Sequence, residues 1–373
     1  MMKRHILLLA AVVTFLCPAG ARAGIVYEVI DLGTLGGDWS CASSINDAGQ
    51  IVGFAEYREG DYRWHATLFD PTGGGNNIDL GTLGLEESLA TSVNNSGQIV
   101  GFALSIVGLR AALFDSTGAG NNIALGGAAA WSINDAGQIV GSANSGVGDM
   151  RATMFDPTGA ANNIDLGTLG GDRSEAYSIN DAGWIVGSAA NAHGGCPATL
   201  FDATGAGDNV DLGTLGGDGG EAWCINDAGK IVGVALDNSD KWRATSFDAT
   251  GRGNNIDLGT LGGDQSGAWS INNAGQIVGW AEYTPGDWRC HATLFDPAGA
   301  GDNIDLNSLI DPDSGWTLIE ARDINNSGWI VGQGINPQGE EHAFLLVPEP
   351  ATFALLGLGI LLLRRRSFGG KER

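Results

Sequence analysis

The chain has 373 residues and a formal net charge of −24, from 43 Asp and Glu against 19 Lys and Arg. A surface this acidic repels phosphate backbones, so we do not expect nucleic acid to be a partner. The 61 glycines favour short strands and tight turns over long helices, because glycine is unfavourable inside helices.

The first 23 residues have the three parts of a secretory signal peptide. Lys3 and Arg4 form a basic start, Ile6–Leu16 forms an apolar core, and Ala21-Arg22-Ala23 forms a small-x-small cleavage site. We therefore predict a signal peptide over residues 1–23, cleaved after Ala23, and export by the secretion machinery.

One ten-residue segment, Ser44–Gly53, occurs in seven copies along the chain. Asn, Asp and Gly at its centre are turn residues, so each copy is expected to form two short strands joined by a tight turn. Near identity among seven turns indicates a scaffold role. The other copies are Ser92–Gly101, Ser132–Gly141, Ser178–Gly187, Cys224–Gly233, Ser270–Gly279 and Asp323–Gly332.

Each repeat unit contains four predicted strands. An Asp-Leu pair, Ala-Leu in one copy, marks the fourth strand and recurs at spacings of 41 to 48 residues, a period typical of propeller blades. The first copy of the fourth strand, Val26–Leu32, precedes every first strand, whereas the last unit lacks a fourth strand. We therefore predict an all-β, seven-bladed β-propeller of four-stranded blades over residues 25–347, closed by the N-terminal strand completing the C-terminal blade. An open β-solenoid is the alternative.

The repeated segments also resemble a known family. Asp-Leu-Gly-Thr-Leu-Gly-Gly, Ser-Ile-Asn-Asp-Ala-Gly-Gln-Ile-Val-Gly and His-Ala-Thr-Leu-Phe are similar to the HAF repeats of bacterial extracellular proteins, and His342-Ala343-Phe344 matches the namesake literally. The resemblance implies secretion and repetition, and it implies no activity or catalytic residue.

Four aromatic residues occupy one position of the predicted first strands. Strand alternation places this position on the same face as the isoleucine two residues later, so we expect the side chains to pack between blades. A stacking platform for sugar rings is the alternative. The residues are Trp131, Tyr177, Trp223 and Trp269, with Ser43, Thr91 and Arg322 in the other copies.

The loops between the second and third strands vary most among the copies, and those of the first and sixth blades are rich in aromatic residues. Aromatic faces beside arginines suit recognition of carbohydrate or protein, whereas local packing is the alternative. The candidate ligand-binding residues are Tyr57, Tyr62, Arg63, Trp64, Trp242, Tyr283, Trp288 and Arg289.

Familiar enzyme motifs are absent from the sequence, which has no Gly-x-Ser-x-Gly elbow, His-Glu-x-x-His pair or phosphate-binding loop. We predict a protein that is not an enzyme, with no cofactor and no metal site. A glycan lyase or hydrolase using carboxylates in the central channel is the alternative. Ca²⁺ could bind in loops such as Asp202–Asn209, although Asp, Asn and Gly are also ordinary turn residues.

The C-terminal segment has three parts in a specific order. Pro348-Glu349-Pro350 precedes the apolar run Ala351–Leu363, which is followed by Arg364, Arg365 and Arg366. Thirteen residues at about 1.5 Å each are shorter than a bilayer core of about 30 Å, so a permanent anchor is not expected.

This order resembles the PEP-CTERM sorting signal of Gram-negative bacteria, which we assign to residues 348–373. The resemblance implies transient membrane insertion, processing by an exosortase-type enzyme, and location at the cell surface or outside the cell. It also associates the protein with biofilm matrices. We therefore expect a binding or structural module for exopolysaccharide or matrix protein.

Overall fold

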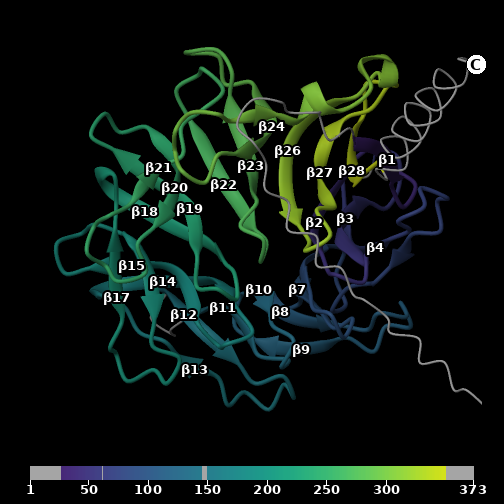
Figure 1. The fold of residues 1–373 in the computed structure, drawn as a ribbon. Coiled ribbons are helices and arrows are strands. Elements are labelled where there is room, and N and C mark those ends of the chain that lie inside the picture. Colours follow the sequence, from purple (N-terminus) through teal and green to yellow (C-terminus); the bar gives the residue numbers. More distant parts are fainter. Residues whose placement is uncertain (1–26, 61, 145–148, 350–373) are drawn as a thin grey trace, which may run out of the picture.

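The computed structural model describes residues 27–60, 62–144 and 149–349, which form seven four-stranded antiparallel sheets around a common axis (Figure 1). Neighbouring strands along the chain are joined by short loops, so each sheet is one repeat unit. The predicted seven-bladed propeller is confirmed. Ala23, Pro350 and the three C-terminal arginines lie outside the described residues. No helix in the described part is long and apolar enough to cross a membrane.

Blades 1 to 3 follow one another in the sequence. Blade 1 contains β2 (Ser40–Ile45), β3 (Ile51–Glu56), β4 (Trp64–Phe69) and β5 (Ile78–Asp79). Blade 2 contains β6 (Ser88–Val93), β7 (Ile99–Ser105), β8 (Gly108–Phe114) and β9 (Ile123–Gly126). Blade 3 contains β10 (Ala129–Ile133), β11 (Ile139–Asn144), β12 (Met150–Phe155) and β13 (Ile164–Asp165).

Blades 4 to 6 continue the same order. Blade 4 contains β14 (Gly170–Ile179), β15 (Ile185–Asn191), β16 (Ala198–Phe201) and β17 (Val210–Gly213). Blade 5 contains β18 (Gly216–Ile225), β19 (Ile231–Asp237), β20 (Trp242–Phe247) and β21 (Ile256–Asp257). Blade 6 contains β22 (Ser266–Ile271), β23 (Ile277–Glu282), β24 (Cys290–Phe295) and β25 (Ile304–Asp305), and the 3-10 helices η1 (Leu306–Leu309) and η2 (Pro312–Ser314) lead to blade 7.

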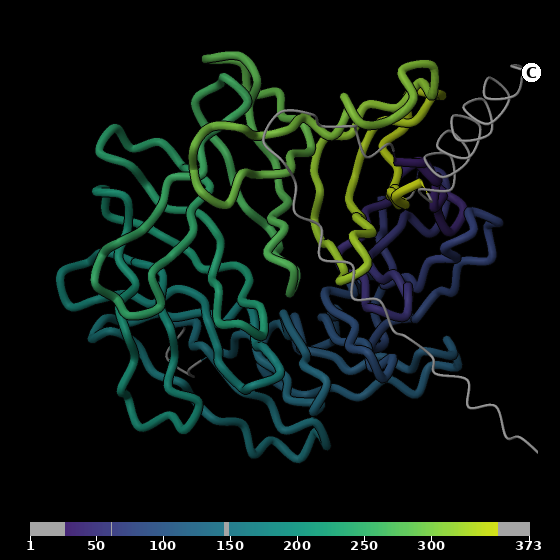
Figure 2. The backbone as a smooth tube through the Cα atoms, viewed as in Figure 1, coloured from purple at the N-terminus to yellow at the C-terminus, as the bar shows by residue number. Residues whose placement is uncertain are grey.

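Blade 7 joins the two ends of the propeller. Its strands β26 (Thr317–Ile324), β27 (Ile330–Ile335) and β28 (Glu341–Pro348) are completed by β1 (Tyr27–Gly33), which pairs with β28 in antiparallel register. Figure 2 shows the purple N-terminal strand beside the yellow C-terminal one. The predicted closure by the N-terminal strand is therefore confirmed, and it excludes the open solenoid.

The hydrophobic core lies between the blades. Val52 and Leu80 of blade 1 pack against Ile99 and Phe114 of blade 2, and all four are buried. The other blade interfaces repeat this arrangement. Each blade packs one apolar face against the next blade. The ring must therefore close to bury the free faces of the first and last blades.

A β-bulge interrupts every first strand next to the axis. In blade 4, Ala176 pairs with Gly187 and Ser178 pairs with Val186, so Tyr177 is the extra residue. The same shift occurs in the other six blades. A Cβ at Gly187 would lie 1.9 Å from the carbonyl oxygen of Glu175, which explains the glycine opposite each bulge.

The bulge overturns one prediction. Strand alternation would bury Trp131, Tyr177, Trp223 and Trp269 between blades, but one extra residue turns each side chain towards the axis, where all four line a cavity.

Candidate functional site

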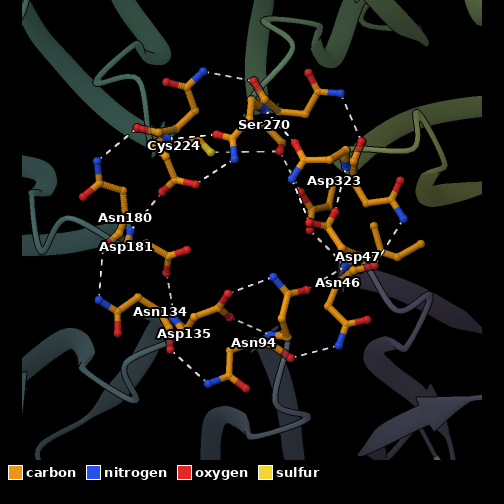
Figure 3. Close-up of a pocket in the computed structure, with 18 of the residues that line it drawn as sticks. Asn46, Asp47, Asn94, Asn134, Asp135, Asn180, Asp181, Cys224, Ser270 and Asp323 are labelled. Carbon is orange, nitrogen blue, oxygen red and sulfur yellow. Dashed lines mark hydrogen bonds between the residues drawn. The ribbon is translucent and has the colours of Figure 1, made fainter. Parts of the chain in front are cut away.

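The seven first-to-second turns form a closed ring around one end of the axis (Figure 3). The buried Asn46 side chain donates from Nδ2 to the backbone oxygen of Asn94 in the next blade at 2.9 Å, and its Oδ1 accepts from the backbone N–H of Gln50 at 2.8 Å. Each following blade repeats the inter-blade bond, until Asn325 donates back to Asn46 at 3.2 Å.

The next residue of each turn makes a second ring. The Asn95 side chain accepts from the backbone N–H of Asp47 at 2.9 Å, and this pattern continues through the blades until Asp47 accepts from Asn326. Burial raises the pKa of Asp181, as do the nearby charges of Asp135 and Asp227. The polar groups of these turns form hydrogen bonds between neighbouring blades, in agreement with the scaffold role predicted from the sequence.

Blade 7 carries Asp323 where the other blades have Ser or Cys. This half-buried carboxylate accepts from Ser270 Oγ of blade 6 at 2.6 Å and from the backbone N–H of Ile45 in blade 1 at 2.9 Å. Burial raises its pKa, and these donors oppose the rise. Asp323 therefore bridges the blades on either side of the closure.

A cavity of about 570 Å³ lies further along the axis and contains the four bulge aromatics. The rings of Trp223 and Trp269 stack at 4.0 Å between centroids, and the Arg322 guanidinium lies 5.0 Å from the Trp269 ring. The Trp269 Nε1 is buried and has no hydrogen-bond partner among the described residues. Phe54 and Phe102 of blades 1 and 2 also line the cavity, and the Phe102 ring lies 5.5 Å from that of Trp131.

Two carboxylates share the aromatic wall of this cavity. Glu175 and Glu221 occupy the same repeat position in neighbouring blades 4 and 5. Glu221 accepts from the indole Nε1 of Trp223 at 2.8 Å. Burial raises the pKa of Glu175, and the neighbouring charge of Glu221 raises it further. The cavity therefore combines flat apolar faces with strong hydrogen-bond acceptors.

A pocket of about 410 Å³ adjoins the cavity between blades 4 and 5, and the two share Glu175, Tyr177 and Glu221. It extends outward along the second-to-third loops to Trp242, so this residue of the predicted ligand set does line a pocket. We call the cavity and the adjoining pocket together the axial cleft.

The predicted loop residues of blade 1 lie in two groups. Tyr57 stacks on His65 at 4.6 Å, whereas Trp64 packs 5.6 Å from Trp39 and 6.4 Å from Phe54, which lines the cavity. Tyr62 is 78% exposed. Arg63 forms an ion pair with Glu86 at 2.8 Å.

In blade 6, Tyr283 packs 4.2 Å from His291 and Arg289 lies 5.7 Å from the Tyr283 ring. Arg289 also pairs with Asp287, and Trp288 is 80% exposed. Blade 7 separates blades 1 and 6 in the ring, so the two aromatic loops do not form one surface.

Three histidines near the start of the third strand pair with the aspartate of the fourth strand. The Nδ1 atoms of His65, His291 and His342 lie 2.9, 2.6 and 2.8 Å from carboxylate oxygens of Asp79, Asp305 and Asp31. These histidines tie the outer strands of their blades together and lie outside the axial cleft.

In the third-to-fourth loops proposed to bind Ca²⁺, the carboxylates accept hydrogen bonds from other residues of the same loop. Asp70 accepts from the side chains of Thr72 and Asn76, and these bonds lower its pKa to about 2. No group of three or more acidic, His or Cys side chains suited to a metal ion occurs in residues 27–60, 62–144 and 149–349.

Sequence reasoning missed Glu175 and Glu221. The signal was the Glu-Ala pair before the aromatic residue, which occurs in blades 4 and 5 and reappears before Arg322 in blade 7. The glutamates of these pairs line the cavity only because the bulge brings this strand segment to the axis in blades 4 and 5, and the bulge could not be read from the sequence.

Residues 346–367 match the PEP-CTERM protein-sorting motif. The motif implies sorting to the cell surface and processing by an exosortase, so the chain is an exosortase-sorted propeller protein. A comparison with curated proteins finds no match.

Proposed function

We propose that this protein is a carbohydrate-binding module of the cell surface or extracellular matrix, and that it holds a saccharide chain in the axial cleft. The observation that carries the proposal is the gathering of four aromatic side chains and two carboxylates in one cavity. Sugar rings present flat C–H faces to aromatic rings, and their hydroxyls donate to carboxylates.

The asymmetry of the cavity supports a binding role. Blades 3 to 6 place Trp131, Tyr177, Trp223 and Trp269 at the bulge, whereas blades 1, 2 and 7 place Ser43, Thr91 and Arg322 there. A purely structural repeat would have no reason to vary at this position, since the bulge itself is the same in every blade. The sorting motif and the resemblance to HAF repeats both agree with a role outside the cell.

Binding of the purified full-length chain to a glycan array, with the exopolysaccharide of the producing cell included, tests the proposal. Trp223→Ala, in the cavity, and Trp242→Ala, in the adjoining pocket, should each weaken binding about ten-fold or more. Trp184→Ala, at an exposed tryptophan in a first-to-second turn, is the matched control and should bind like the wild type. Failure to bind any glycan, or equal binding by Trp223→Ala and Trp184→Ala, would reject the site.

The loop residues predicted from the sequence offer a separate surface for the same class of ligand or for a matrix protein. Tyr62 and Trp288 are the loop aromatics of this set with the greatest exposure. The double variant Tyr62→Ala with Trp288→Ala separates this surface from the axial cleft, because neither residue lines it.

A glycan-active enzyme is the second candidate. A carboxyl group with a raised pKa beside a second carboxylate is the arrangement that glycoside hydrolysis uses, and Glu175 with Glu221 has these properties. Glu175 would be the acid and Glu221 the base or nucleophile. Release of oligosaccharides from a bound polysaccharide, abolished by Glu175→Gln while binding persists, would favour the enzyme. Binding without any release favours the module.

A further inference from the structure

The junction between blades 2 and 3 is shorter than the usual junction between blades. Eight positions separate Ala124 from Ser132, whereas thirteen separate the equivalent Asp165 and Ser178 in the next unit. The missing residues are those of the Gly-Thr-Leu-Gly-Gly connection. Gly126 and Gly127, with φ of 83° and 61°, make the short turn that replaces it.

A pocket of about 420 Å³ lies at this junction, a volume within the usual range of small-molecule sites. Arg110 of blade 2 and Arg151 of blade 3 both line it, together with the exposed apolar side chains of Val107 and Leu109. Asn144 and Thr153 add neutral polar groups. Since the axial cleft involves none of these residues, the pocket is a separate site.

Arg110 and Arg151 occupy the third-strand position at which blades 1, 5, 6 and 7 carry a His or Arg paired with an aspartate. Arg243 of blade 5 shows the usual arrangement, because its Nε donates to Asp257 at 3.1 Å and its Nη1 donates to the Asp264 backbone oxygen at 3.1 Å. In blade 2 the fourth strand has Ala124 instead of the aspartate. Arg110 has no ion pair within 4.0 Å among the described residues.

Arg151 is also without a carboxylate partner in the described part of the chain. Its Nε is buried and has no hydrogen-bond partner, which is costly for a cationic group. Asp165 lines the same pocket, but it forms no ion pair with Arg151 and instead accepts from the backbone N–H of Gly167 at 2.8 Å. Two guanidinium groups therefore face one carboxylate, which leaves a net positive pocket.

We propose that this pocket binds the carboxylate group of an acidic saccharide, such as a uronate, between Arg110 and Arg151. Planar guanidinium groups match carboxylates with paired hydrogen bonds, and Val107 and Leu109 provide an apolar wall for the sugar ring. The rest of the protein is strongly acidic and repels anions, so retention of a carboxylate requires a local site of this kind.

A uronate trisaccharide and its carboxyl-reduced analogue, titrated calorimetrically into the purified full-length chain, test the proposal. The acidic sugar should bind and the reduced analogue should bind about ten-fold more weakly or not at all. Arg110→Gln and Arg151→Gln should each weaken binding of the acidic sugar by a similar factor.

Ala124→Asp is the sharpest variant, because it restores the partner that the repeat normally supplies and leaves both arginines in place. It should weaken binding of the acidic sugar about ten-fold, whereas Arg243→Gln, at the equivalent position in blade 5, should leave it unchanged. Thermal melts of each variant are the control that the fold is retained.

Three results would overturn the proposal: equal binding of the two trisaccharides, wild-type binding by Ala124→Asp, or tighter binding of inorganic phosphate than of the acidic sugar at this pocket. The test is independent of the axial cleft, because Trp223→Ala should leave binding of the uronate here intact.

Discussion

The asparagine ring allows a quantitative test of what holds the blades together. In Asn180→Ala the backbone oxygen of Asn226 loses one of its two donors, at 3.0 Å, and the backbone N–H of Trp184 loses its acceptor at 2.9 Å. Asn180 is only 4% exposed, so water does not readily replace it. The Asn226 oxygen keeps the Gly229 N–H as a donor at 2.9 Å, so the loss of these two bonds should lower the unfolding free energy by about 1–3 kcal/mol.

Urea unfolding followed by tryptophan fluorescence measures this cost. Asn254→Ala is the control, since the exposed Asn254 side chain donates only to Asp248 in an outer loop, and it should change stability by about 0.5 kcal/mol or less. Asn180→Asp keeps the acceptor and loses the donor, so it should be destabilising at neutral pH and recover partly on acidification. If Asn180→Ala unfolds at the same urea concentration as Asn254→Ala, the ring does not stabilise the propeller and the reasoning is wrong.

Three further predictions concern the fold. Phe247→Ala, in the core between blades 4 and 5 and 6% exposed, should lower the unfolding free energy by about 3–5 kcal/mol, against less than about 1.5 for Ile256→Ala on the surface, as measured by urea unfolding. Deleting residues 27–32 should expose the edge of β28, lower the melting temperature and promote aggregation in light scattering, and a deletion variant as stable as the full chain would contradict a closed ring. Burial raises the pKa of Asp79, but the hydrogen bonds from His65 and Gly81 outweigh burial and lower this pKa below its ordinary value of 3.8. The Asp79 carboxylate therefore stabilises the fold at a pH above 3.8. This stabilisation is lost as the pH falls through the lower pKa of the folded state. Asp79→Asn should flatten the acid side of the stability profile below about pH 5, and an unchanged slope in urea titrations would count against the pair.

The architecture was predictable because it depends on local patterns. Turn residues such as Asn46-Asp47 and Gly49 recur in every unit, at intervals of 40 to 53 positions, and strand alternation between them is clear. The fourth strand that precedes the first blade revealed the closure, which the pairing of β1 with β28 confirms. The PEP-CTERM motif was equally readable, since it is a continuous segment.

The candidate site was less predictable, since it depends on relations between strands. Trp64 and Tyr283 were chosen for their variable loops, yet they pack on neighbouring rings of their own blades. Glu175 and Glu221 are 46 positions apart in sequence and meet only because consecutive blades stand side by side around an axis.

The sequence by itself determined the number of blades, the strands in each and the way in which the ring closes, because repetition, turn chemistry and hydrophobic alternation all act over short distances. Only the tertiary structure decided the direction of Trp131, Tyr177, Trp223 and Trp269. One extra residue in a strand reverses the face that follows it, and its presence depends on pairing with the next strand. In blade 2 the fourth strand carries Ala124 instead of the aspartate, and its pairing with Ala112 places it beside the strand of Arg110, which lines the neighbouring pocket.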